Sequence, residues 1–370
     1  FLVHRPIEIP QLKGDVADFH EATGYIVFAF SGIDFEFGKD EAMWGPGPLD
    51  NLGLSHNAPT FTMLRMHSQI GKLSFVSLTG ALRPCPARRD SPICGDIASD
   101  DSYIVNGQTR ILERQKYLSG HRLEVALTPW LDLGFHELVV YGDRNIEPTY
   151  FNPFMFYWAA QSHLGDKDNV LMGLDVDIRP FKDTRIYASY FIDDLKKAKV
   201  FSDDYANKFS MQIGVHIVDP KRFENSDLNL EYVRIEPWIY THKYPINIYR
   251  HFDSPLGYNL PPNSKKYTAT IRKRFPRFFT VEFDFERIWH GANYVDGQGI
   301  TQNVGGSLHY GWQPGDEREV KFSTLYSFPS PIIKMFRLSI ANLLASLQIF
   351  NIVDSSLKQG IRIIISCFCN

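Results

Sequence analysis

Acidic side chains recur at two-residue spacing in this sequence. Asp175 and Asp177 form one such pair, and Glu282, Asp284 and Glu286 form a longer run. In an extended strand, residues two apart share a face and lie about 6 to 7 Å apart. Inverting glycosidases hold their two carboxyl groups about 6.5 to 9.5 Å apart, so a hydrolytic site is one interpretation. The other is a charged face that lines a hydrated interior. Because any acidic strand face gives this spacing, we favour the second interpretation and predict no catalytic residues.

Other reactive residue types show no catalytic or metal-binding pattern. The 12 histidines include no HExxH arrangement, so we expect them on an interior wall or in loops rather than around a metal ion. Nucleophile elbows, phosphate-binding glycine loops and dinucleotide fingerprints do not occur. Cys85 and Cys94 share one proline-rich segment and are consistent with either a disulfide or two free thiols, whereas Cys367 and Cys369 are poorly spaced for a bridge. We expect no metal and no cofactor.

Composition narrows the class of protein. The net charge of −3 gives no general attraction to nucleic acid, which we exclude as a partner. The aromatic content of 14 % favours strands, and aromatic residues also form the girdles of membrane barrels.

No run of consecutive apolar residues approaches the roughly 18 to 20 that a transmembrane helix needs. The sequence begins at Phe1 without a methionine or an apolar export signal, so either such a signal was removed or the sequence is a fragment.

Strict two-residue alternation is the dominant pattern. In residues 170–180, Leu174, Val176 and Ile178 share one face, and charged residues occupy the other. Residues 209–218 and 279–286 repeat the pattern. Weaker copies occur at 33–37, 123–128, 184–193, 228–240, 267–273, 306–312 and 320–326. Turn-forming clusters separate these segments and no convincing helical period lies between them, which predicts consecutive antiparallel hairpins.

Two places interrupt the alternation. Glu137 falls on the apolar parity of its segment, and residues 232–235 change parity midway. We expect β-bulges or strand ends there. From about residue 331 the alternation is lost, and this part is expected to be either a helix followed by a terminal strand or an aberrant end.

The chemistry of the two faces favours a membrane barrel over a soluble sandwich. One face is rich in Phe, Leu, Ile and Val, and the other carries carboxylates, Arg, His and Gln, as a hydrated lumen would. The predicted fold is an all-β antiparallel outer-membrane β-barrel of about 14 to 18 strands with meander topology, incomplete at both ends. Residues 1–330 would form this single domain, and residues 331–370 an atypical C-terminal segment.

Three ordered groups of short motifs resemble the Wzi capsule-assembly family. The first comprises residues 37–40 (FGKD), 44–47 (WGPG) and 54–59 (LSHNAP). The second comprises residues 121–123 (HRL), 134–137 (GFHE), 141–142 (YG), 152–154 (NPF), 168–169 (DN), 173–175 (GLD) and 192–194 (IDD). The third comprises residues 240–242 (YTH), 255–257 (PLG) and 262–264 (PNS). Their order and spacing extend over roughly Phe35 to Ser264, about three fifths of the chain.

The resemblance implies a non-enzymatic protein of the outer membrane of a Gram-negative-type bacterium. Such a protein would contact outer-membrane lipid and bind or organise surface or capsular polysaccharide, and we expect it to be a monomer. Two alternatives stay open: a passive, porin-like channel for small polar solutes and, third in order, a glycoside hydrolase.

The candidate carbohydrate-binding residues lie mainly in the long connection from Pro245 to Lys266. Membrane barrels have short periplasmic turns and longer external loops, so this connection should lie outside. Aromatic faces and hydrogen-bonding groups suit the apolar faces and hydroxyl edges of sugars. The alternative is a polar loop folded into the barrel mouth, and for Trp44 a structural turn. The candidates are Tyr249, Arg250, His251, Asp253, Tyr258, Asn259 and Trp44.

Overall fold

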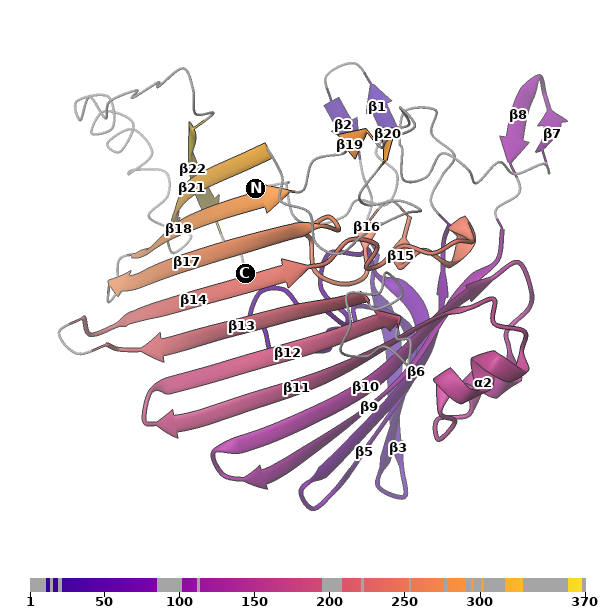
Figure 1. The fold of residues 1–370 in the computed structure, drawn as a ribbon, viewed down its shortest axis with the longest axis horizontal. Helices are drawn as coiled ribbons and strands as arrows, with labels where there is room; N and C mark the ends of the chain where they lie inside the picture. Colours follow the sequence, from indigo (N-terminus) through magenta and orange to yellow (C-terminus); the bar gives the residue numbers. More distant parts are fainter. Residues whose placement is uncertain are drawn as a thin grey trace.

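The computed structural model of the chain is dominated by one large β-sheet (Figure 1). The structure describes residues 11–13, 16–18, 22–84, 102–111, 114–194, 208–220, 223–252, 254–275, 279–290, 294–295, 301–302, 317–328 and 359–367.

Fourteen strands make up the large sheet. They are β3 (Gly24–Phe30), β4 (Ile33–Asp40), β5 (Phe61–Ile70), β6 (Leu73–Leu82), β9 (Lys116–Thr128), β10 (Leu131–Gly142), β11 (Asn169–Phe181), β12 (Thr184–Asp194), β13 (Lys208–Val218), β14 (Ser226–Ile235), β17 (Ser264–Phe275), β18 (Phe279–His290), β21 (Glu317–Phe328) and β22 (Gln359–Cys367). Each strand pairs with its sequence neighbour in the sheet. All pairings from β3 to β21 are antiparallel, which confirms the predicted meander.

Four short two-stranded pairs lie in the connections. They are β1 (Gln11–Lys13) with β2 (Val16–Asp18), β7 (Ser102–Val105) with β8 (Gln108–Ile111), β15 (Arg250–His251) with β16 (Ser254–Pro255), and β19 (Tyr294–Val295) with β20 (Thr301–Gln302).

The C-terminal strand β22 differs from the others because it runs parallel to β21, with Phe322 opposite Ile361. A terminal strand was one of the two expectations for residues 331–370, and the proposed division at residue 330 stays a prediction. The strand predicted at 306–312 lies outside the described residues, as do Cys85 and Cys94.

The three strongest sequence patterns correspond to β11, β13 and β18. The pattern at 228–240 predicts too long a strand, because β14 ends at Ile235. The parity change at 232–235 therefore coincides with a strand end. At Glu137, in contrast, the predicted bulge is wrong: β10 keeps continuous register with β9 and β11 through that residue.

The two ends of the sheet differ in the length of their connections (Figure 1). At one end, hairpins turn within a few residues, and Ser31 and Gly32 adopt φ angles of 52° and 79° between β3 and β4. Left-handed residues at both central positions match the twist of a two-residue hairpin. At the other end, long connections such as residues 143–168 and 236–263 join the strands. In membrane barrels the short turns are periplasmic and the long loops external.

Short helices occupy two of the long connections, contrary to the sequence-based expectation. They are α1 (Pro148–Phe151), α2 (Tyr157–His163) and the 3-10 helix η2 (Pro245–Asn247). The longest has seven residues, fewer than two full turns, so no helical period could emerge from the sequence. None of the helices in the described part of the chain is long and apolar enough to cross a membrane.

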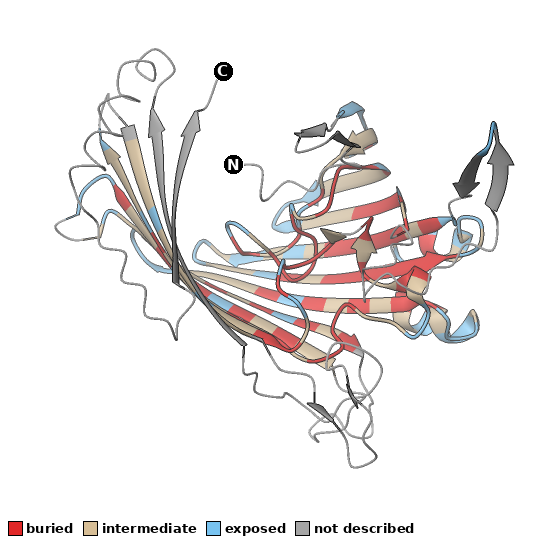
Figure 2. Cartoon of the chain, turned by 90° about the horizontal axis from the view of Figure 1, so that it is seen from above, coloured by how far each residue is buried: buried red, intermediate tan, exposed pale blue. Residues whose placement is uncertain are grey.

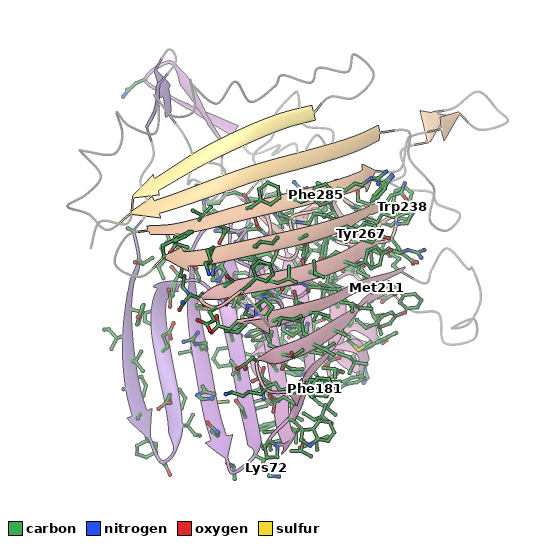
Figure 3. All side chains as sticks on the ribbon, turned by 90° about the vertical axis from the view of Figure 1, so that its left-hand side faces the viewer. Lys72, Phe181, Met211, Trp238, Tyr267 and Phe285 are labelled. Carbon is green, nitrogen blue, oxygen red and sulfur yellow. The ribbon has the colours of Figure 1, made fainter. Side chains whose placement is uncertain are left out.

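Strand register shows which face of the sheet is interior. The inward side of β18 carries Glu286, which binds Lys266 Nζ at 3.1 Å. Lys266 in turn lies 4.7 Å from the ring of Tyr258, which belongs to an interior loop. Apolar side chains such as Leu174, Ile213 and Ile271 take the opposite parity and are exposed. Figure 3 labels Met211 of β13, Tyr267 of β17 and Phe285 of β18, which share this outward parity.

Candidate functional site

Two long connections fold back into the interior of the curved sheet. Residues 41–60 join β4 to β5, and residues 236–263 join β14 to β17. Figure 2 shows buried segments in the space enclosed by the sheet. We call these two connections together the inner plug. Both begin and end at the long-connection end of the sheet, so the plug enters from that end.

The two halves of the inner plug are hydrogen-bonded to each other. Ser55 donates its backbone N–H to the carbonyl of Leu256 at 2.8 Å. The hydroxyl of Tyr249 donates to the carbonyl of Gly53 at 2.9 Å. These partners are about 200 positions apart in the chain, so the two halves of the plug are brought together by the tertiary fold.

Asp50 is a hydrogen-bonding centre of the plug. Its carboxylate accepts from Asn57 Nδ2 at 2.8 Å, from the backbone N–H of Asn259 at 2.9 Å and from the Ser55 hydroxyl. Its backbone carbonyl accepts from Gln212 Nε2 of β13 at 2.8 Å. Burial raises the pKa of the Asp50 carboxyl to about 6, although the hydrogen bonds from Ser55 and Asn259 act in the opposite direction. One side chain thus ties together both halves of the plug.

Aromatic rings fill the space between the plug and the inner wall. Tyr240 and Tyr249 stack with ring centroids 5.5 Å apart, and Phe191 of β12 lies 5.7 Å from Tyr240. Trp44 sits over Gly120 of β9, where a Cβ atom would come within 2.8 Å of the indole ring. A glycine inside a strand often marks such a close approach.

The wall beneath the plug contributes a second hydrogen-bonding centre. Glu231 of β14 accepts hydrogen bonds from the hydroxyls of Tyr187 and Tyr258 and from Gln212 Nε2, at 2.8, 2.7 and 2.8 Å. Only Tyr258 comes from the plug. The buried carboxylate is therefore satisfied jointly by wall and plug, as a buried charge requires.

The acidic pairs noted in the sequence bind cations or hydroxyl groups on the inner wall. Arg122 forms an ion pair with Asp175 and approaches His136 Nδ1 at 3.0 Å. Asp177 accepts from Arg185 Nε at 2.5 Å. On the far strands, Glu282 pairs with Arg272, Asp284 accepts from Thr270 and Glu286 pairs with Lys266. This arrangement is that of a charged wall, and no group of three potential metal ligands occurs among the residues that the structure describes.

The candidate residues from the sequence fall mostly inside the plug. Trp44, Tyr249, His251 and Tyr258 are buried, with Tyr249 and Tyr258 only 0 % and 1 % exposed. Their packing against the inner wall agrees with the alternatives of a loop folded into the barrel mouth and, for Trp44, a structural turn, and their assignment to a carbohydrate site stays a prediction. Arg250 is half-buried and Asn259 is exposed, while Asp253 lies outside the described residues.

An exposed aromatic and basic group lies within the second plug segment, residues 236–263. Tyr244 is 43 % exposed, and its ring lies 5.1 Å from Lys243 Nζ and 5.6 Å from the ring of His242. Burial lowers the pKa of His242 to about 4, so its ring is neutral at pH 7. The following Asn247 donates to the carbonyl of Lys167, which fixes this stretch to the connection between β10 and β11. We call residues 242–244 the rim patch.

Sequence reasoning missed the central role of Asp50 and the rim patch as a surface. A signal for the plug was present, since the motifs at residues 44–47, 54–59, 240–242, 255–257 and 262–264 lie in its two segments or at their ends. What alternation could not indicate is that these motifs meet.

Comparisons with known proteins agree with the fold and motifs. The profile of the family described as "Capsule assembly protein Wzi" matches residues 5–328. The solved structure of Wzi from Escherichia coli, described as a carbohydrate-binding β-barrel of the outer membrane involved in group 1 capsule assembly, has 14 % identity and a TM-score of 0.50. The match covers 74 % of this chain but 57 % of that one, so this chain spans little more than half its length.

Other matches are weaker. OccK10 (OpdN) from Pseudomonas aeruginosa has 11 % identity, a TM-score of 0.39 and coverage of 77 % of this chain and 71 % of its own. OprB from Pseudomonas putida has 11 % identity and a TM-score of 0.38, and the match covers 70 % of this chain and 64 % of OprB. Among curated proteins there is no match. The fold is that of an outer-membrane β-barrel, as the sequence predicted.

Proposed function

Because this chain belongs to the Wzi family of capsule assembly proteins and is an outer-membrane protein of Gram-negative type, we propose that it holds surface polysaccharide at the outer end of its barrel without catalysing a reaction. Capsular polysaccharide is the proposed ligand class. We further propose that the protein acts as a monomer, which light scattering of the purified protein in detergent tests.

The inner plug is the observation that carries this proposal. It packs against the inner wall from β9 to β14 and is tied there by buried hydrogen bonds to Glu231 and Gln212. Hydrogen bonds are electrostatically stronger in a buried, low-dielectric setting than in water, so these bonds help to hold the plug in one arrangement. A rigid plug favours binding at the barrel mouth over free passage through the interior.

The rim patch is the surface that we propose for the glycan. Its tyrosine ring offers an apolar face for sugar C–H groups, and its lysine and histidine offer hydrogen bonds to hydroxyl or acidic groups. Arg250 and Asn259 keep accessible surface and remain candidates for direct contact, as does Asp253. Trp44, Tyr249, His251 and Tyr258 would support the site from within the plug, because protein covers their faces.

The test is a double variant, Lys243→Ala with Tyr244→Ala, expressed in encapsulated cells. We expect normal barrel levels, a several-fold drop in cell-bound polysaccharide and a matching rise in polysaccharide released to the medium. The control is Phe223→Ala, which removes an exposed ring from the short turn between β13 and β14 at the opposite end. Unchanged retention in the double variant would remove the rim patch from the site.

The channel and hydrolase alternatives have separate tests. A porin-like channel would give steady conductance in planar bilayers, whereas we expect the plugged protein to give none. A glycoside hydrolase would release reducing ends from surface glycan. We expect no release, because the carboxylates of Asp175 and Asp177 are already engaged in ion pairs with Arg122 and Arg185 on the inner wall.

A further inference from the structure

The outer wall of the barrel carries a polar pair where a lipid-facing residue would be apolar. Glu137 of β10 and His121 of β9 share the outward parity, and His121 Nε2 lies 3.1 Å from Glu137 Oε2. Glu137 also accepts the backbone N–H of Tyr157, the first residue of α2, at 3.0 Å. Glu137 is fully buried although it faces away from the plug. The helical connection therefore covers this part of the outer wall.

One side of the helical connection, residues 146–164, packs on the barrel. Tyr150, Tyr157 and Ala160 form a buried cluster with Val139 and Tyr141 of β10. The neighbouring inward residues of the same strand, Leu138 and Val140, pack with the plug instead. The connection thus lies on the opposite face of the sheet from the plug, beside β10 as Figure 1 shows.

Large apolar side chains of the connection remain exposed. Phe154 is 82 % exposed, and Ile146, Phe151 and Phe156 are each about half exposed, at 47 %, 48 % and 51 %. Four such side chains within 11 residues form an apolar patch, which in an isolated soluble protein would be unusual. Phe154 also stacks on Phe75 of β6, with ring centroids 5.5 Å apart and planes inclined by 12°. Phe75 has the outward parity of the lipid-facing wall, so the patch continues that wall.

Polar residues flank the helical connection in the sequence. Arg144 makes a bidentate ion pair with Asp168, and Gln161 donates to Asp166, which is exposed. An exposed aromatic and apolar surface between polar flanking residues, set at the end of a membrane barrel, has the chemistry of an interfacial element.

We propose that residues 146–164 are an interfacial anchor, which inserts Phe151, Phe154 and Phe156 into the outer leaflet of the outer membrane beside β6 and β10. The apolar patch would contact lipid acyl chains rather than another protein. The continuity of Phe154 with Phe75 supports this choice, since the same surface then meets acyl chains without a break. The inference depends on the membrane position of the barrel and does not depend on glycan binding.

The experiment replaces Phe154 with the photocrosslinking residue p-benzoylphenylalanine in the full chain, expressed in cells. Because the side chain is largely exposed, the larger ring fits without repacking. After irradiation, we expect adducts with outer-membrane lipid, identified by mass spectrometry. A second variant carries the same residue at Phe156.

Two controls make every outcome decisive. The same residue at Phe283, on the lipid-facing parity of β18, should give lipid adducts and confirms that the barrel is inserted. At Lys167, exposed beyond the helices, it should give none. Lipid adducts at Phe283 but none at Phe154 and Phe156, or protein adducts at those two positions, would overturn the anchor. Loss of capsule retention in the rim-patch variant has no bearing on this result.

Discussion

The hydroxyl of Tyr258 donates a 2.7 Å hydrogen bond to the carboxylate of Glu231 and so joins the inner plug to the barrel wall. Tyr258→Phe keeps the ring and removes only this bond. Leaving a buried acceptor without one of its donors costs about 1 to 3 kcal/mol. We expect faster hydrogen exchange in residues 254–263, measured by mass spectrometry, with the strands of the sheet unchanged.

The matched control for this change is Tyr232→Phe on the outer face of the same strand as Glu231. Its ring packs against Tyr267 rather than the plug. Equal effects of the two substitutions on residues 254–263 would show that the Tyr258 hydroxyl does not hold the plug.

Asp50 gives the plug a pH dependence of predictable sign. Its folded-state pKa of about 6 lies above the ordinary value of 3.8, so between these values the folded state binds more protons than the unfolded state. The contribution of this group to the free energy of unfolding therefore falls as pH rises from about 4 to about 6, and it is level outside that window. Burial lowers the pKa of His242 to about 4 and that of His251 to about 3, which acts with the opposite sign in this window. The difference in denaturant midpoint between the natural protein and Asp50→Asn therefore isolates the Asp50 contribution.

Asp50→Asn removes this contribution, because the amide does not titrate, so the stability of the natural protein relative to Asp50→Asn should fall between about pH 4 and pH 6. Asp34→Asn, at an exposed carboxylate on β4, is the control and should show no such pH-dependent difference. A difference between the natural protein and Asp50→Asn that stays constant across this window would show that the Asp50 carboxyl is not the titrating group.

Gly120 makes room for Trp44. In Gly120→Ala the new methyl group would lie within 2.7 Å of Leu138 Cδ2 and 2.8 Å of the Trp44 ring, so one of them must move. Overpacking of this kind costs about 1 to 3 kcal/mol. We expect residues 41–60 to become sensitive to protease added to intact cells. Gly24→Ala is the control, because a Cβ at that position meets nothing within 4 Å. It should not change the protease resistance of residues 41–60.

The two faces of β18 should respond in opposite ways to a charge. Val281→Arg places a cation on the lipid-facing side and should destabilise the barrel by about 2 to 4 kcal/mol if it lies near the bilayer midplane. Thr280→Arg, on the lumen side, should have a much smaller effect. Unfolding from detergent or lipid with urea measures both, and equal losses would contradict the assignment of faces.

Local sequence determined the strands and their two faces. In β11 and β18 the side chains alternate because successive residues of an extended chain point to opposite sides, and this property needs no distant contact. The ordered motifs also indicated the family, since motif order and spacing are properties of the chain itself.

Tertiary structure alone decided where Tyr249, Tyr258 and Glu137 lie. The two tyrosines occur in a polar connection that has the composition of an external loop, and their burial depends on partners such as Gly53, far away in the chain. Glu137 looks like a break in the pattern, yet it lies in regular register and is covered by a helix too short to recognise. Alternation records only which side of a strand a residue faces, whereas burial depends on what folds over that side.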